Sequence, residues 1–290
     1  MGSLSLLLLT LVQASPADTT LRARIEARIA RAPAKAVGLY FHDLSGGDSL
    51  TVGAATRFHA ASTMKVPVMI QLFRDQDAGL RSLDDSITVT NTFRSIVDSS
   101  PYQLDKADDS DSSLYARVGE RVAIRELIEL METVSSNLAT NLLIARVDAR
   151  RANATAHALG ADSILVLRGV EDGKAYRAGL SNTTTARDLG VLLAAIAQGR
   201  AASPASCREM LAILGRQRFN EGIPAGLPPG ARVYHKTGWI GGVVYHDAAL
   251  VESGGRRYVL VVLTGGVEKD ADAYGLVSDL SRLIFDRGKR

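Results

Sequence analysis

Three short motifs contain the residues of this chain that could do nucleophilic chemistry. The first is Ser62-Thr63-Met64-Lys65, which precedes an apolar segment, residues 66–73, expected to be a helix. Side chains three residues apart share a helix face, so the Lys65 amine can reach the Ser62 hydroxyl. A serine hydroxyl needs a neighbour to remove its proton, and a lysine whose pKa is lowered by burial and by a helix amino terminus can do so. Alone, the motif also fits an exposed helix start.

The second and third motifs are Ser-Ser-Asn at residues 135–137 and Lys-Thr-Gly at residues 236–238. The second lies between two amphipathic helical patterns, where a loop could direct two side chains into a cleft. Helix capping by one of its serines is the alternative. The third closes a predicted strand, where Gly238 would let a ligand approach the sheet edge. An ordinary strand end is the alternative there.

In this order along the chain, the three motifs resemble the class A β-lactamase family, within the serine β-lactamase and penicillin-binding protein superfamily. Residues 135–143, Ser-Ser-Asn-Leu-Ala-Thr-Asn-Leu-Leu, are similar to the family's Ser-Asp-Asn-x-x-x-Asn-Leu-Leu, and Leu-Pro-Pro-Gly at 227–230 precedes the third motif. The resemblance implies an α/β fold of the α+β type. In this β-lactamase/transpeptidase-like arrangement, terminal helices flank an antiparallel sheet and an all-helical domain is inserted.

The same resemblance implies the catalytic roles. Ser62 would be the acylated nucleophile, and Lys65 would be its general base or proton relay. Ser135 would pass a proton to the departing lactam nitrogen. Asn137 would hold the side-chain amide of the substrate.

It also implies the binding roles of the third motif. Lys236 would present positive charge to the substrate carboxylate, and the Thr237 hydroxyl would bind the same group beside Gly238. The backbone N–H groups of Ser62 and Trp239 would form the oxyanion hole. The Trp239 side chain is unusual at this offset, and it either narrows the cleft or packs in the core.

A loop glutamate that activates the hydrolytic water is the next implied residue, and Glu171 is the natural match. The loop is shortened, because Glu171 lies closer to the threonines at 183–185 than in the family pattern. Asp172 is a rival carboxylate, and a solvated loop charge is the alternative for Glu171. Asn141 matches the family residue that contacts the loop glutamate.

Three further positions depart from the family. The charged pair across the neck of the glutamate loop would be Arg168 and Asn182, so its negative end is missing. Ser136 replaces the central aspartate of the second motif. Gly222 stands where some members place an arginine, which leaves carboxylate recognition to the third motif. The polar stretch 94–117 is expected to be a surface excursion.

Hydrophobic periodicity predicts the elements that would position these residues. Helices are expected over 21–32, 66–73, 122–131, 138–147, 185–197 (opened by a Thr185-x-x-Asp188 capping box) and 272–285. Strands are expected over 36–42, 49–52, 232–236, 243–251 and 257–264, with a hairpin turn at 253–255. Residues 15–60 and 205–290 would form the sheet domain and residues 61–204 the helical domain, with the active site in the cleft between them.

Composition restricts the remaining possibilities. The 290 residues are 46% hydrophobic and 22% charged, which excludes a disordered or collagen-like chain. A net charge of +3 without a basic block, and 5% aromatic residues, argue against nucleic acid as a partner. One cysteine cannot form an internal disulfide, and the five histidines lack zinc-site spacing, so no metal or other cofactor is expected. The predicted partner is a small-molecule β-lactam, and the protein is expected to be a monomer without a membrane span.

The amino terminus suggests export. Leu4–Val12 is apolar but shorter than the roughly 20 residues that a membrane helix needs. Ala14 and Ser15 follow, so residues 1–14 are predicted to be a signal peptide cleaved near Ala14, giving a periplasmic or extracellular protein. Met1-Gly2-Ser3 carries no positive charge, and a plain amino-terminal helix or tail is the alternative.

Three functional hypotheses follow. The first is a class A β-lactamase, which would confer antibiotic resistance. It would form an acyl-enzyme on Ser62 and hydrolyse it with water activated by Glu171. The second is a related serine hydrolase, either a D,D-peptidase or an esterase. The third is a penicillin-binding sensor that is acylated without turnover. The Glu171 loop is the feature that distinguishes them.

Overall fold

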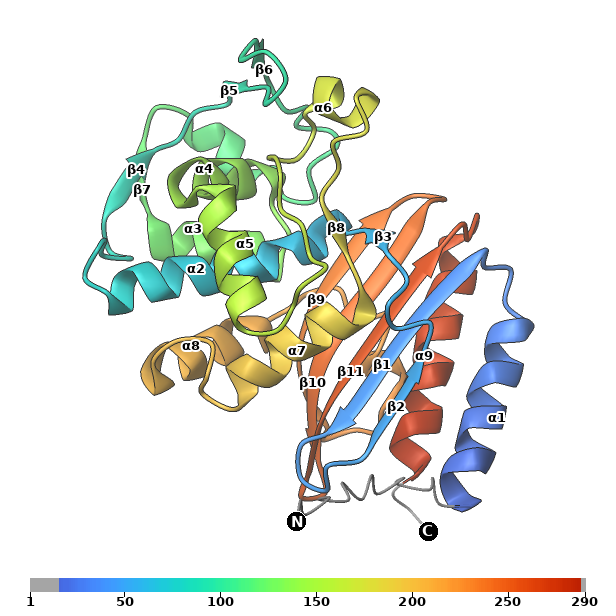
Figure 1. Ribbon diagram of the computed structural model, residues 1–290. Coiled ribbons are helices and arrows are strands. Elements are labelled where there is room, and N and C mark those ends of the chain that lie inside the picture. Colours follow the sequence, from blue (N-terminus) through green and yellow to red (C-terminus); the bar gives the residue numbers. More distant parts are fainter. Residues whose placement is uncertain (1–15, 288–290) are drawn as a thin grey trace, which may run out of the picture.

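The computed structural model describes residues 16–287, so the predicted signal peptide lies outside the described residues. Five strands form the main sheet: β1 (Ala36–Asp43), β2 (Ser49–Val52), β9 (Arg232–Ile240), β10 (Val244–Ser253) and β11 (Arg256–Gly265). They are antiparallel throughout, in the order β2-β1-β11-β10-β9 (Figure 1). The predicted hairpin between the last two strands is confirmed, and Gly254 and Gly255 both take the positive φ of its tight turn.

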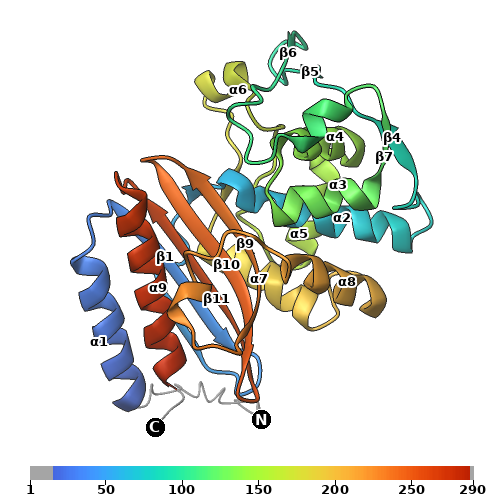
Figure 2. The same cartoon turned by 180° about the vertical axis from the view of Figure 1, so that it is seen from behind.

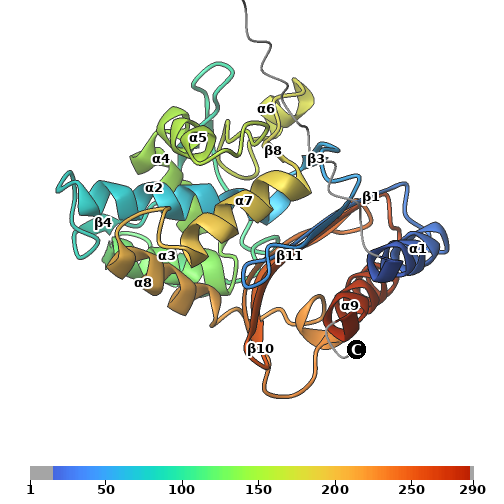
Figure 3. The same ribbon diagram turned by 60° about the horizontal axis from the view of Figure 1, so that its bottom comes forward.

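The sheet is the middle of three layers. The helices α1 (Pro16–Ala30) and α9 (Asp270–Asp286) cover one face, as Figure 2 shows from behind. A lobe made mostly of helices covers the other face, and Figure 3 shows the two layers on opposite sides of the sheet. The fold class expected from the sequence, an antiparallel sheet flanked by terminal helices with an inserted helical part, is confirmed.

The strands read as continuous apolar runs because both faces of the sheet are buried. In β11, Leu260 and Val262 belong to the core beneath α1 and α9. The alternating residues Val259, Val261 and Leu263 belong to the core that the sheet shares with the helical lobe. Successive strand side chains point to opposite faces, so one strand supplies both cores.

The helical lobe contains seven α-helices among the described residues: α2 (Lys65–Asp77), α3 (Ile124–Thr133), α4 (Asn137–Val147), α5 (Ala149–Ala158), α6 (Gly173–Arg177), α7 (Ala186–Ala197) and α8 (Pro204–Leu214). Short 3-10 turns are η1 (Ala61–Met64), η2 (Ser113–Arg117) and η3 (Pro224–Gly226). Two-stranded pairs join β3 (Phe58–His59) to β8 (Thr183–Thr184), β4 (Ser86–Thr88) to β7 (Arg121–Ala123), and β5 (Phe93–Arg94) to β6 (Pro101–Tyr102).

Helix α2 is the centre of this lobe and packs against α3, α4, α5 and α8. It is longer than its apolar run suggests, because polar residues continue it to Asp77. Pro67 is its third residue, where the missing N–H would have no partner within the helix. The 3-10 turn η1 before it therefore explains a proline that otherwise appears to interrupt the helix.

Several predicted element ends differ from the structure, and two of these differences bear on the site. The helix expected from 122 starts at Ile124, since the two preceding residues pair with β4 as part of β7. The strand expected to end at Lys236 continues to Ile240, because its pairing with β10 runs through Gly238, opposite His246. The third motif therefore lies within β9, the edge strand of the sheet, and not at its end.

Candidate active site

The nucleophile motif forms the tight turn η1 directly before α2. Ala61 has a φ of 45°, a left-handed conformation that is uncommon outside glycine. The Thr63 hydroxyl donates to the carbonyl oxygen of Ala60 at 2.6 Å and fixes the turn. Ser62 stays partly exposed, whereas Lys65, the first residue of α2, is fully buried. The turn therefore presents an accessible serine and a buried lysine three residues apart.

The three motifs meet at the hydroxyl of Ser135. The Lys65 Nζ donates to the Ser135 Oγ at 3.0 Å and to its carbonyl oxygen at 2.7 Å. The Lys236 Nζ donates to the same Oγ at 3.1 Å. Ser135 itself has a φ of 57°, and this left-handed backbone turns the loop toward both lysines. The structure thus brings Lys65, Ser135 and Lys236 together from α2, the loop before α4 and β9.

Burial changes the acid–base behaviour of both lysines. The pKa of Lys65 lies well below its usual range, first because burial disfavours the ammonium form and second because Lys236 repels it. Burial also lowers the pKa of Lys236 to about 8, although the charges of Glu132 and Asp247 oppose the shift. A pKa of about 8 leaves Lys236 mostly protonated near neutral pH. Lys65 is suited to accept a proton and Lys236 to present a charge.

Glu171 lies in the same hydrogen-bonded group. Its Oε1 accepts from the Nδ2 of Asn137 at 3.0 Å, and its Oε2 accepts from the backbone N–H of Asp105 at 3.1 Å. The Oδ1 of Asn137 accepts from the Lys65 Nζ at 3.3 Å, so Asn137 connects the lysine to the carboxylate. Burial raises the pKa of Glu171, while these two hydrogen bonds act against the increase. The φ of Glu171 is 61°, a left-handed conformation that costs a non-glycine residue energy.

Asn141 holds the loop one residue before the glutamate. Its Oδ1 accepts from the Val170 N–H at 2.7 Å, and its Nδ2 donates to the Val170 carbonyl oxygen at 3.0 Å. The sequence resemblance implied a contact with Glu171 itself, but the hydrogen bonds that Asn141 makes to this loop go to the backbone of Val170. Asn141 therefore acts on the glutamate by fixing the backbone beside it.

Asp172, the rival carboxylate, is committed to the backbone. Its Oδ1 accepts from the Ala175 N–H and from the Ser95 hydroxyl, and its Oδ2 accepts from the Ile96 N–H. Burial would raise the pKa of Asp172, but these hydrogen bonds outweigh burial and lower it. A carboxylate that caps α6 and anchors a neighbouring loop is a structural group, so Glu171 is the carboxylate available to the site.

The neck of the glutamate loop is closed without an ion pair. The Oδ1 of Asn182 accepts from the N–H groups of Leu167 and Arg168 at 2.8 and 3.1 Å. Its Nδ2 donates to the Arg168 carbonyl oxygen at 3.0 Å. An amide both donates and accepts, so Asn182 closes the loop through the backbone where the family pattern has a charged pair.

The third motif gives β9 two different faces. A Cβ on Gly238 would lie 3.1 Å from the Thr63 Cγ2 and 3.2 Å from the Ala60 oxygen, so a glycine allows η1 to pack on the strand. Strand alternation places Lys236 on that face and Thr237, which pairs in register with Asp247, on the other. As an edge strand, β9 leaves alternate N–H groups unpaired, as an oxyanion hole requires.

The Trp239 side chain is not part of the core. It is 53% exposed, and its Nε1 donates to Asp270 at the start of α9 at 2.9 Å. Of the two alternatives for this side chain, core packing is therefore wrong. Gly222, in the position where some family members carry an arginine, packs against the Asp247 carboxylate and the Tyr245 hydroxyl, which a Cβ there would meet at 2.5 and 2.6 Å.

Two carboxylates of the site were not predicted from the sequence. Asp109, in the polar stretch 94–117, accepts from the N–H groups of Asn137 and Leu138 at 2.9 Å each and so caps α4. The hydroxyl of Ser136 accepts from Ala139 in the same cap. No local pattern marks Asp109, since it reaches the site only through the tertiary fold. The second, Glu132, is fully buried on α3.

Glu132 did leave a signal in the sequence. Ile124, Leu127, Ile128 and Met131 recur at the spacing of a buried helix stripe, and Glu132 takes the next position on that stripe. A charged residue on an apolar face points to a special environment. Among residues 16–287, no group of three or more His, Cys, Asp or Glu side chains could hold a metal ion, and no helix is long and apolar enough to cross a membrane.

Comparison with known proteins places this site in a family. The sequence model of the beta-lactamase enzyme family matches residues 20–287. The structure of PBP-A is 31% identical with a TM-score of 0.80, and the match covers 93% of this chain and 96% of that one. A beta-lactamase from Sphaerobacter thermophilus is 28% identical with a TM-score of 0.78, covering 94% and 98% of the two chains.

An ancestral class A beta-lactamase is 25% identical with a TM-score of 0.78, covering 92% of this chain and 99% of that one. No curated protein sequence matches the chain. The family match runs through all three motifs, the glutamate loop and both terminal helices of the described fold. The chain therefore belongs to the beta-lactamase enzyme family.

Proposed function

We propose that this protein is a serine β-lactamase of class A type, which is acylated on Ser62 and hydrolyses the acyl-enzyme with water activated by Glu171. The observation that carries the proposal is the line of hydrogen bonds from Lys65 through Asn137 to Glu171. It connects a base suited to acylation with a carboxylate suited to deacylation. The two half-reactions need different proton acceptors, and this site contains both.

In acylation, neutral Lys65 accepts the Ser62 proton as Oγ attacks the lactam carbonyl carbon. The N–H groups of Ser62 and Trp239 stabilise the oxyanion. The carbon–nitrogen bond then breaks, and the leaving nitrogen takes the proton of Ser135, which Lys65 replaces across their 3.0 Å hydrogen bond. Lys236 presents its charge to the substrate carboxylate, and Gly238 lets η1, which carries Ser62, pack close to the strand beside it.

In deacylation, Glu171 takes a proton from a water molecule that attacks the ester carbonyl carbon. The ester bond breaks, the Ser62 oxygen takes up the proton that Glu171 removed from the water, and the opened β-lactam leaves. A raised pKa makes Glu171 a better base than an ordinary surface glutamate, which is nearly always ionised and weakly basic. Asn137 and the Asp105 N–H orient the carboxylate.

Glu171→Gln tests the second half-reaction. The amide keeps the size of the side chain but cannot accept a proton, so the variant should be acylated and then retain the adduct. Mass spectrometry of the protein over time after penicillin addition measures both steps, and loss of a general base slows one step by about 10² to 10⁴. Glu26→Gln on α1, where the carboxylate pairs with Arg22 at the surface, is the matched control.

A second candidate is a penicillin-binding protein that is acylated with little turnover. The similarity to PBP-A favours it, as does the left-handed backbone at Glu171 in a shortened loop. An adduct that persists equally long in the wild type and in Glu171→Gln would select this candidate. Rapid turnover of a D-alanyl-D-alanine peptide without β-lactam hydrolysis would select a D,D-peptidase.

The remaining parts of the proposal concern the cellular context. We infer export from the apolar run Leu4–Val12, with hydrolysis of β-lactams outside the cytoplasm giving antibiotic resistance. Mass spectrometry of the amino terminus of the protein isolated from its native host would test cleavage near Ala14. A light-scattering mass of one chain would support the proposed monomer.

A further inference from the structure

Glu132 is a buried carboxylate that the proposed mechanism does not use. It is fully inaccessible to solvent near the end of α3, and within residues 16–287 neither carboxylate oxygen has a hydrogen-bond partner. Its backbone is fixed, because the Gln217 Nε2 donates to its carbonyl oxygen at 2.8 Å. A buried charge without such partners is costly, so the residue requires an electrostatic explanation.

The two lysines of the site supply that explanation. The charges that act on Glu132 are those of Lys236 and, more weakly, Lys65. Both amines are fully buried and donate to Ser135, which is only three residues further along the chain than Glu132. Burial raises the pKa of Glu132 to about 7, so its carboxylate is ionised at the mildly alkaline pH at which Lys236, with a pKa of about 8, begins to lose its proton.

The other charged groups around the lysines come from several elements. The negative charges of Asp109, in the polar stretch 94–117, and of Glu171, in the glutamate loop, both act to raise the pKa of Lys65. The other acid that acts on Lys236 is Asp247 of β10. Asp247 is already bound, because its Oδ1 contacts the His235 Nδ1 at 2.9 Å and its Oδ2 accepts from the Ile223 N–H at 2.8 Å. Glu132 acts on Lys236 more strongly than Asp247 does.

We propose that Glu132 is the buried counter-charge of Lys236 and, through that lysine, a positioning residue for the carboxylate of the substrate. This inference rests on the proposed function, in which Lys236 binds that carboxylate. Glu132 does not touch substrate. It compensates the burial of the Lys236 ammonium, so that Lys236 stays charged under conditions in which Lys65 has lost its proton.

The sign of the effect follows from the charges. Burial lowers the pKa of Lys236, and the negative charge of Glu132 raises it again, to about 8 in total. Glu132→Gln removes the negative charge and keeps the shape of the side chain. The proton of Lys236 should then be lost at lower pH, and the alkaline limb of the acylation profile should move in the same direction. An opposite charge nearby typically shifts a pKa by about 1 to 3 units, so acylation at a fixed alkaline pH should fall roughly tenfold or more.

The first experiment measures the lysines directly and needs no β-lactam. NMR titration of the protein with 13C-labelled lysine follows the Cε signals of Lys65 and Lys236, assigned with Lys236→Arg. The expected result is a Lys236 midpoint above that of Lys65 in the wild type, lowered by about one pH unit or more in Glu132→Gln. A wild-type Lys236 that titrates at or below Lys65 would overturn the proposal even if the variant failed to fold. An unchanged midpoint in a folded variant would overturn it as well.

The second experiment measures the rate of acylation by benzylpenicillin against pH. Glu129→Gln is the matched control, since it removes the same charge from the same helix but from a side chain that is 35% exposed and paired with Arg216. Its profile should equal that of the wild type, and Glu132→Asp should restore much of the alkaline limb. If the wild type is not acylated at all, the proposed function fails while the NMR result stands. If acylation proceeds but Glu132→Gln leaves the profile unchanged, the inference about Glu132 fails alone.

Discussion

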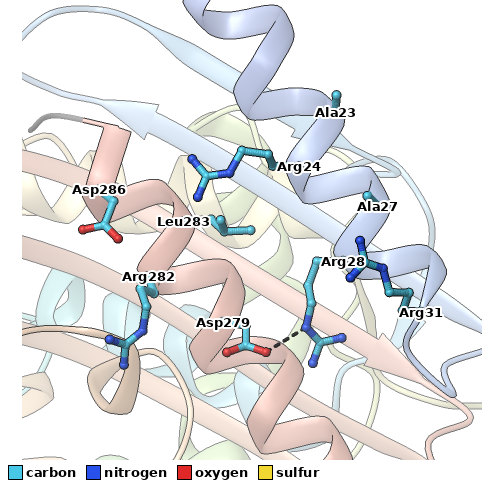
Figure 4. Close-up of a pocket in the computed structure, with 9 residues that line it drawn as sticks. All are labelled: Ala23, Arg24, Ala27, Arg28, Arg31, Asp279, Arg282, Leu283 and Asp286. Atoms are coloured by element: carbon cyan, nitrogen blue, oxygen red, sulfur yellow. Dashed lines mark hydrogen bonds and ion pairs between the residues drawn. The ribbon is translucent and has the colours of Figure 1, made fainter. Parts of the chain in front are cut away.

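Two clusters of basic side chains among the described residues differ in burial and in their acid–base behaviour. One is the pair Lys65 and Lys236, both fully buried around Ser135. The other is a set of arginines along a groove of about 490 Å³ between α1 and α9, drawn in Figure 4: Arg24, Arg28, Arg31 and Arg282. Three of these arginines are exposed, and Arg28, partly buried, pairs with Asp279 at 2.7 Å.

The difference shows which conditions make a basic side chain reactive. A guanidinium in water keeps its proton and its hydration whatever its neighbours are, and exposed ion pairs contribute little. Burial of Lys65 beside Lys236 removes hydration from two amines at once and lowers the pKa of both. The buried lysines should therefore control reactivity, and the groove arginines should affect only surface electrostatics.

Ser62→Ala should have the largest effect. Every step of the proposed reaction passes through the Ser62 Oγ, so no covalent penicillin adduct should form and kcat should fall by about 10⁶. Mass spectrometry after penicillin exposure and a chromogenic cephalosporin assay measure the two quantities. An adduct on the variant would show that the nucleophile is another residue. The buried lysines would then not be the basic cluster that controls reactivity.

Lys65→Ala should have the next largest effect. Acylation should slow by about 10² to 10⁴ because the Ser62 proton loses its acceptor. The fold should survive, since replacement of a buried amine removes a group that is expensive to desolvate. In the wild type, the acylation rate should decline above about pH 8 as Lys236 loses its proton. Stopped-flow acylation across pH and a thermal melt separate these effects, and a wild-type rate in Lys65→Ala would refute its role as base.

The same contrast explains how much could be predicted from the sequence. Local spacing singled out Ser62 and Lys65, and the structure places them in a turn and at the start of the helix that follows, with the Lys65 amine donating to Ser135 and Asn137. The β-branched runs gave the sheet, whose two buried faces the structure confirms. The end of β9 could not be predicted from its own residues. The strand continues through Gly238 because it pairs with β10 there.

Contacts made by irregular segments were beyond local reasoning. Asp109 and the N–H of Asp105 reach Asn137 and Glu171 from a stretch without periodicity, so their positions depend on the whole tertiary fold. Glu132 is different, because its place on the apolar stripe of α3 was visible in the sequence. A glutamate on the buried stripe of this helix, considered together with the two lysine motifs, would have indicated a buried site in which negative and positive side chains lie close together.

Arg28→Ala should have the smallest effect, and it tests the other half of the comparison. The side chains of Arg28 and Asp279 are 26% and 53% exposed, so water and salt screen most of their attraction. Loss of the pair should change the free energy of unfolding by no more than about 1 kcal/mol, and less at high salt. Urea unfolding at low and high salt measures that change, and the acylation rate should equal that of the wild type. The groove is lined by residues of α1 and α9, and these helices cover the face of the sheet opposite to the helical lobe that contains α2 (Figure 3). A fall in acylation without a fall in stability would mean that the sheet transmits changes between its faces, and the two clusters could then no longer be treated as independent.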